Sequence, residues 1–144
     1  MVKDRFSLLG FKDHHHGKSA KFKKLKGCTP FGNKIAIADL DNNAVRSLDV
    51  DSSAVESIIK RGASGSPDGE YTASSSSGGG VSLPLFIESL NDTHLIVVQR
   101  TSGLVRVIDT VNKIITTLVD LGDNVGLYSL SGYDTTINCF SSFI

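Results

Sequence analysis

The feature that most constrains the fold of this chain is an internal repeat with an offset of 60 residues. Apolar residues coincide in three successive pairs of blocks, 34–38 with 94–98, 44–49 with 104–109, and 54–59 with 114–119. Within the second pair, Val, Arg and Asp recur at identical places. A chain that repeats in this way is expected to fold into repeated supersecondary units that stack on one another.

Upstream of these blocks the register of the repeat changes. The best offset there is 52 residues, which places Gly17 over Gly69. The second copy is then about eight residues longer than the first, and the run Ser74–Gly80 accommodates the difference. A flexible Ser/Gly insertion between elements leaves the packing of a repeat unchanged.

Each copy of the repeat is predicted to form short strands rather than helices. Blocks rich in Val, Ile and Leu recur about every ten residues between turn formers, which is typical of an antiparallel meander. The blocks 34–38 and 94–98 are apolar at every position after the first, as expected for strands buried on both faces. Sheets covered on both faces must be stacked, either in a sandwich or in the blades of a propeller.

Several short motifs, divided between the two copies, correspond to successive elements of one repeat. They are a Gly–x–x–Gly–x–x–Asp–Gly element at 62–69, an apolar–x–x–Pro step at 81–84, an Ala-Asp strand end at 38–39 and a Val-Arg…Asp strand at 105–109. This order resembles the NHL repeat over roughly residues 6–122. The sequence departs from the NHL pattern at Gln99, Gly103 and Leu25, which stand where Asp, Asn and Pro are expected.

The resemblance implies an all-β fold, a partial β-propeller of two four-stranded antiparallel blades. Leu8–Leu9 would add the outer strand of a preceding blade. The expected division is a basic arm with that strand and a loop (1–26), blade 1 (27–62), a linker with blade 2 (63–122) and an unassigned tail (123–144). Two blades cannot close a ring and repeat folds need capping. We therefore expect a fragment, association of several copies, or capping by the chain's own ends.

Composition narrows the class of protein. No stretch of the 144 residues approaches about 18 consecutive apolar residues, and the N-terminus does not resemble a signal peptide. A cytoplasmic or intracellular protein without membrane contact is therefore expected. The two cysteines, Cys28 and Cys139, are too few for a disulfide scaffold and have no metal-ligand spacing.

The net charge of the chain is zero, but its N-terminal segment is basic. Residues 1–26 carry eight Lys and Arg side chains against Asp4 and Asp13, so the remaining residues are acidic. The candidate nucleic-acid ligands are Lys18, Lys21, Lys23, Lys24 and Lys26, with the aromatic Phe22 among them. Such a run binds phosphates through charge, but it is equally typical of a solvated connection.

Two further groups of residues carry candidate chemistry. The triplet His14–His15–His16 offers imidazole ligands for a metal, although a zinc site needs ligands from several elements and a solvated loop fits the triplet better. The residues that recur between copies are expected at strand ends, where carboxylates accept turn N–H groups and arginines pair with an acid of a neighbouring blade. These structural residues are Asp39, Arg46, Asp49, Arg106 and Asp109.

Three classes of function are consistent with these features. The first is a non-catalytic propeller module that binds another protein, because rim loops of a propeller offer a rigid and variable surface. The second is RNA binding by the basic segment, and the third is a metal-dependent, lyase-like propeller enzyme. We predict no catalytic residues and no cofactor, since no nucleophile has a base positioned beside it in the sequence.

Overall fold

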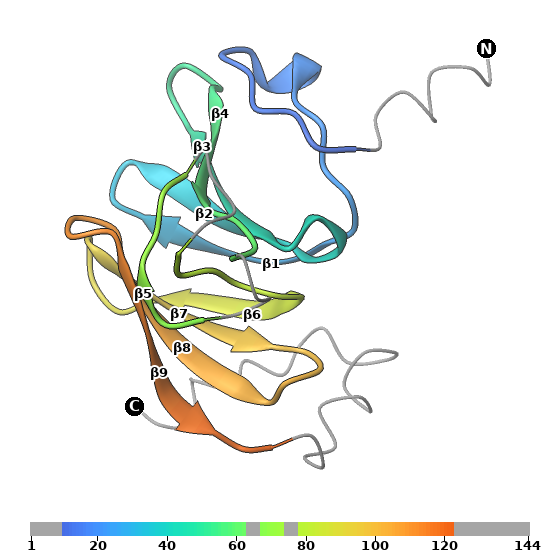
Figure 1. The fold of residues 1–144 in the computed structure, drawn as a ribbon. Helices are drawn as coiled ribbons and strands as arrows, with labels where there is room; N and C mark the ends of the chain where they lie inside the picture. Colours follow the sequence, from blue (N-terminus) through green and yellow to red (C-terminus); the bar gives the residue numbers. More distant parts are fainter. Residues whose placement is uncertain (1–9, 63–66, 74–77, 123–144) are drawn as a thin grey trace.

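The computed structural model describes residues 10–62, 67–73 and 78–122, which form two antiparallel sheets (Figure 1). The first sheet has the strand order β1-β2-β3-β4, with β1 Leu25–Phe31, β2 Lys34–Asp39, β3 Ala44–Asp49 and β4 Val55–Ile59. The second has the order β5-β9-β8-β7-β6, with β5 Gly69–Glu70, β6 Pro84–Ser89, β7 His94–Gln99, β8 Leu104–Asp109 and β9 Ile114–Asp120. The predicted all-β class with two stacked antiparallel blades is confirmed.

The two sheets repeat each other strand by strand. β2 and β7, and likewise β3 and β8, lie 60 residues apart. The β-bulge between Val45 and Arg46 recurs between Val105 and Arg106. A bulge adds one residue to a strand and bends it, so its recurrence means that the copies share backbone geometry as well as sequence pattern.

The predicted register upstream of the strands is wrong. His14 pairs with Val55 of β4, and Gly69 pairs with Ile115 of β9, so these equivalent residues lie 55 positions apart rather than 52. Gly17 lies instead in the short 3₁₀ helix η1 (Gly17–Ser19), whereas Gly69 lies in β5. The offset of 52 relies on the match of Gly17 with Gly69. A glycine indicates a permissive backbone and not a particular strand pairing.

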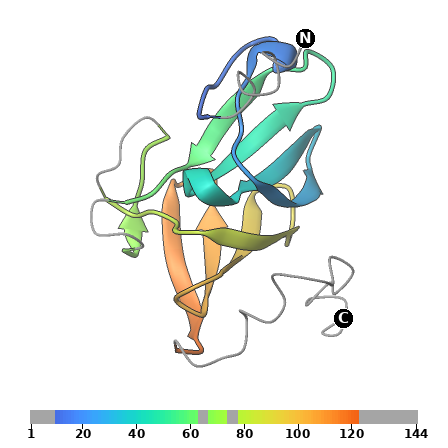
Figure 2. The same cartoon turned by 90° about the vertical axis from the view of Figure 1, so that its right-hand side faces the viewer.

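The hydrophobic core lies mainly between the two blades, which Figure 2 shows one above the other. β2 and β3 of blade 1 contribute small side chains, with Ala36, Ala38 and Val45 all fully buried, and β4 adds Ile58 and Ile59. Blade 2 contributes larger ones from all four of its long strands. These are Ile87, Leu95, Val97, Ile108 and Ile115. Small residues on one sheet let the bulky aliphatic residues of the other approach closely, as native packing density requires.

A connector precedes each blade. It pairs with the outer strand of that blade, β4 or β9, and then leads into the innermost strand, β1 or β6. We call residues 10–24 the first connector and residues 67–73 with 78–83 the second connector. The expected outer strand at Leu8–Leu9 and the tail at 123–144 lie outside the described residues. In the described part of the chain, no helix is long and apolar enough to cross a membrane.

Candidate functional site

A buried arginine fixes the first connector to blade 1. The Arg46 guanidinium is fully buried, and its Nη1 donates to Asp39 Oδ2 at 3.0 Å. Its Nε and Nη2 lie 2.9 and 2.6 Å from Asp13 Oδ1. Nη1 also donates to the carbonyl of Lys21, and Nη2 donates to that of Lys12. A strand side chain therefore holds three points of the connector, and at one of them, Asp13, the partner is a carboxylate.

A second arginine makes the equivalent contacts in blade 2. Arg106 is fully buried, and its Nη2 donates to Asp68 Oδ1 at 2.7 Å and to the carbonyl of Pro67. Its Nη1 donates to the carbonyl of Gly80 and to Gln99 Oε1. The two clamps differ in one place, because a neutral glutamine stands where blade 1 has the buried carboxylate of Asp39.

These contacts refine the expectation for the recurring residues. Asp39, Asp49 and Asp109 do end their strands, as predicted. Arg46 and Arg106 lie inside β3 and β8, and neither pairs with an acid of a neighbouring blade. Arg46 pairs with Asp13 of the first connector and Asp39 of its own blade, and Arg106 pairs with Asp68 of the second connector. Sequence reasoning missed Asp13 and Asp68 in this role because they lie in turn-like stretches far from the arginines along the chain.

Each connector acid also bonds the outermost long strand of its blade. Asp13 Oδ2 accepts the N–H and hydroxyl of Ser57, and Asp68 accepts the N–H and hydroxyl of Thr117. Burial favours a raised pKa for Asp68, but the Thr117 bonds and the Arg106 charge outweigh it and lower the pKa. The same acid thus links connector, third strand and outer strand, which identifies the clamps as scaffold.

The acids that end β3 and β8 shape the next turn. Asp49 Oδ1 accepts the N–H groups of Asp51 and Ser52, and Asp109 Oδ1 accepts those of Val111 and Asn112. These backbone hydrogen bonds, with those from the Ser52 hydroxyl and the Asn112 amide, lower the pKa of both carboxyls. Such Asx turns satisfy backbone donors without help from a partner molecule.

Acid is expected to destabilise the fold through these carboxylates. Asp49, Asp68 and Asp109 have a lower pKa in the folded chain than their ordinary 3.8, so they stabilise it above that pH. This contribution is lost as the pH falls below the ordinary value and through the lower folded pKa values. Denaturant unfolding at a series of pH values should show a shallower acid loss when all three become Asn. Equal slopes for native protein and triple variant would contradict the assignment.

The basic segment is attached to blade 1 along much of its described length. Backbone hydrogen bonds join His14 to Val55 of β4, and Lys24 and Lys23 to Leu40 and Asp41, whereas the bonds between Gly10 and Phe22 and between Lys12 and Lys21 lie within the segment. Three of the candidate lysines, Lys18, Lys23 and Lys24, are exposed, and the other two, Lys21 and Lys26, are half-buried. The Phe22 ring lies 4.7 Å from the Arg46 guanidinium carbon, so it packs within the clamp. A base could not stack on that face without displacing the arginine.

The histidine triplet forms a stack on the first connector. The rings of His14 and His15, and those of His15 and His16, lie 4.3 Å apart between centroids. His14 Nδ1 accepts the N–H of His16, and the pKa of His14 is lowered by desolvation, by His15 and by the charge of Lys12. Among the described residues, no three His, Cys, Asp or Glu side chains converge to hold a metal ion.

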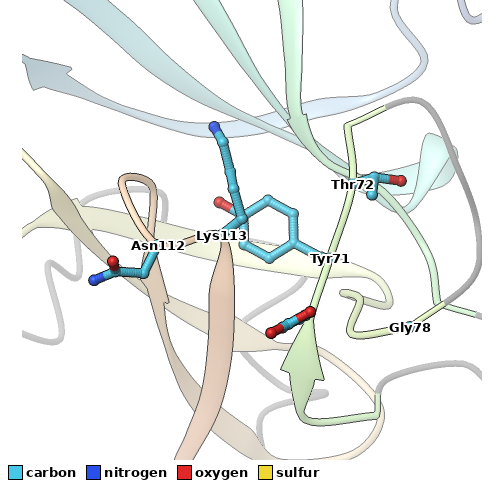
Figure 3. Close-up of a pocket in the computed structure, with 6 residues that line it drawn as sticks. Tyr71, Thr72, Gly78, Asn112 and Lys113 are labelled. Atoms are coloured by element: carbon cyan, nitrogen blue, oxygen red, sulfur yellow. The ribbon is translucent and has the colours of Figure 1, made fainter.

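A cavity of about 320 Å³ lies beside the outer edge of blade 2 (Figure 3). Tyr71, Asn112 and Lys113 line it, together with Glu70, Thr72 and Gly78. The Tyr71 hydroxyl donates to the carbonyl of Asp109 at 3.3 Å, and burial with the Asp109 charge raises its pKa. Figure 3 shows Asn112 and Lys113 extending in different directions. The phenol of Tyr71 is therefore a neutral structural donor.

Exposed apolar side chains mark one rim of the blades. Val50, Leu90 and Val111 follow β3, β6 and β8, and they are 62%, 53% and 66% exposed. The ends of β6 and β8 lie on the same rim of blade 2 because both strands are antiparallel to β7, and β3 is the strand of blade 1 that is equivalent to β8. Figure 1 shows the turns after β6 and β8 together on the left side of the view. We call Val50, Leu90 and Val111 the apolar rim.

Comparison with known proteins does not add to this description. No protein-family model matches the sequence, and no curated protein matches it. The site must therefore be understood from its own geometry.

Proposed function

We propose that this chain is a non-catalytic, NHL-like propeller module that binds a partner protein through its apolar rim. The observation that carries the proposal is the exposure of Val50, Leu90 and Val111 at turns of one rim. Apolar side chains held on tight turns lose little conformational entropy on binding, which favours a protein surface as the ligand. Asp49 and Asp109 order two of these turns through their hydrogen bonds to backbone N–H groups.

A protein ligand fits the surface chemistry better than RNA or a small substrate. Phe22, which lies among the candidate lysines, and Phe11 both pack on Arg46, so those ring faces are not available for a base to stack on. Hydrogen bonds of the recurring acids and arginines are directed at the scaffold, so these residues do not form a reaction centre. The turns of the rim combine apolar tips with polar flanks, which is the usual anatomy of a protein interface.

Replacing the apolar rim should abolish partner retention. We expect the immobilised native chain to retain one or a few polypeptides from cells that express it, identified by mass spectrometry. The variant Val50→Ser, Leu90→Ser, Val111→Ser should lose them, because burial of exposed aliphatic side chains supplies affinity at an interface. A tenfold or greater loss of retained partner is expected, equivalent to about 1.4 kcal/mol.

The control for this experiment changes exposed leucines away from the rim. Leu25, Leu118 and Leu121 are 49%, 61% and 44% exposed and lie at the opposite ends of their strands or beyond. Their triple serine variant should retain the same polypeptides as the native chain. Equal retention by both variants, or loss from both, would contradict a partner site at the apolar rim.

A further inference from the structure

Each blade has one face turned towards the other blade and one face turned away. The inward face of blade 1 includes Ala36 and Ala38, which alternate along β2 with Ile35 and Ile37. The inward face of blade 2 includes Leu95 and Val97 of β7. Because successive side chains of a strand point to opposite faces, Ile35 and Ile37 belong to the outward face of blade 1. The outward face of blade 2 carries Ile96 and Val98 by the same rule.

The strand register completes both outward faces. Leu48 is paired with Ile35, so it joins the outward face of blade 1. Val105 and Val107 are paired with Val98 and Ile96, so they join the outward face of blade 2. The outward face of blade 2 is therefore aliphatic at the centre of the sheet, where an exposed sheet surface would normally carry polar side chains. The outward face of blade 1 carries Ile35, Ile37 and Leu48 beside Arg46, which is paired with Ile37 and covered by the first connector.

The repeat relates the outward faces to the interface already present inside the chain. Ile35 and Leu48 are the equivalents of Leu95 and Ile108, which lie 60 residues later on the inward face of blade 2. Val105 is the equivalent of Val45 on the inward face of blade 1. The outward face of blade 1 thus has the residue pattern of the blade 2 face that packs on blade 1, and we call it the receiving face. The outward face of blade 2 has the pattern of the blade 1 face that packs on blade 2, and we call it the received face.

The exposed fraction of a side chain differs between a repeat position that lies between the blades and the equivalent position on an outward face. Leu95, Ile108 and Val45 are completely buried between the blades. Their equivalents Ile35, Leu48 and Val105 are only half-buried. Ile37, Ile96 and Val98 on the outward faces are already buried within the chain, whereas Ile35, Leu48, Val105 and Val107 stay partly exposed. The described residues therefore cover the outward faces only in part.

We propose that the outward face of blade 2 packs on the outward face of blade 1 of a second copy of this chain, head to tail. The contact would continue the stacking between blades 1 and 2 and would bury both aliphatic faces. It joins two different surfaces, so an open assembly keeps one free face at each end until it closes into a ring. The proposal concerns the blade faces and does not use the apolar rim, so either proposal can fail alone.

Two single-face variants test the head-to-tail contact in the full-length chain. Leu48→Arg blocks the receiving face, and Val107→Arg blocks the received face. Both positions are half-buried, so the long arginine stem lets the charge reach water and the monomer should fold. Light scattering over a wide concentration range should show the native chain at several times its mass of 15.4 kDa and each variant at that mass. Circular dichroism should show equal strand content in all three.

Mixing the variants distinguishes head-to-tail association from other kinds. Each variant retains one functional face, and the two retained faces differ, so an equimolar mixture should form a dimer of twice the chain mass and nothing larger. The triple serine variant of the apolar rim should assemble like the native chain. A native chain that stays monomeric at every concentration would overturn the proposal. So would a single variant that dimerises alone, because that result indicates pairing of like faces.

Discussion

Replacing Arg46 with methionine is expected to lower the free energy of unfolding by about 3–5 kcal/mol, the usual cost of removing one partner of a buried ion pair. Asp39 is fully buried, and its Oδ2 accepts a hydrogen bond from the arginine at 3.0 Å. Without the guanidinium, the carboxylate would keep only neutral donors, the N–H of Lys23 and the amide of Asn42. Methionine fills much of the same volume, so the loss should report charge and not packing.

The second clamp supplies a matched comparison within the same chain. Arg106→Met leaves the neutral Gln99 buried and the acid Asp68 half-exposed, with its carboxylate still bonded to Thr117. We therefore expect Arg106→Met to cost clearly less than Arg46→Met in denaturant-induced unfolding. Adding Asp39→Asn to Arg46→Met should restore part of the stability, because no buried charge then remains. Equal losses for both arginines, with no recovery in the double variant, would be inconsistent with this assignment.

The strands could be predicted because their pattern is local. Blocks of aliphatic residues between turn formers fix the positions of β2, β3, β7 and β8, and the coincidence of Arg46 with Arg106 fixes their equivalence. Polar turn chemistry was predictable for the same reason, since Asp49 and Asp109 act on residues two and three positions ahead.

The clamps could not be predicted because their partners are distant in sequence. Asp13 reaches Arg46 across 33 positions and Asp68 reaches Arg106 across 38, through connectors of different length. A charged residue in a turn-like stretch gives no local sign that it will meet a buried arginine. The role of Phe22 was hidden likewise, because its ring contacts a strand residue and not the lysines beside it.

Truncating Leu95 to alanine is expected to lower the free energy of unfolding by about 2–5 kcal/mol. Leu95 is completely buried in the core between the blades, where loss of its side chain leaves a cavity in addition to the lost transfer free energy. Its equivalent Ile35 has the same place in blade 1 but is half-buried. Ile35→Ala should therefore cost less than about 2 kcal/mol in dilute protein, because part of that side chain is already in water.

Protein concentration should change the stability cost of Ile35→Ala and leave the stability cost of Leu95→Ala unchanged. If a second copy covers the outward face of blade 1, the cost of Ile35→Ala rises with concentration, because burial in the assembly is added to the stability of the fold. Leu95 is covered by its own chain at every concentration, so its cost stays constant. Denaturation midpoints measured over a concentration series give both values. A cost for Ile35→Ala that equals the Leu95→Ala cost in dilute protein would mean that its face is already fully covered within one chain.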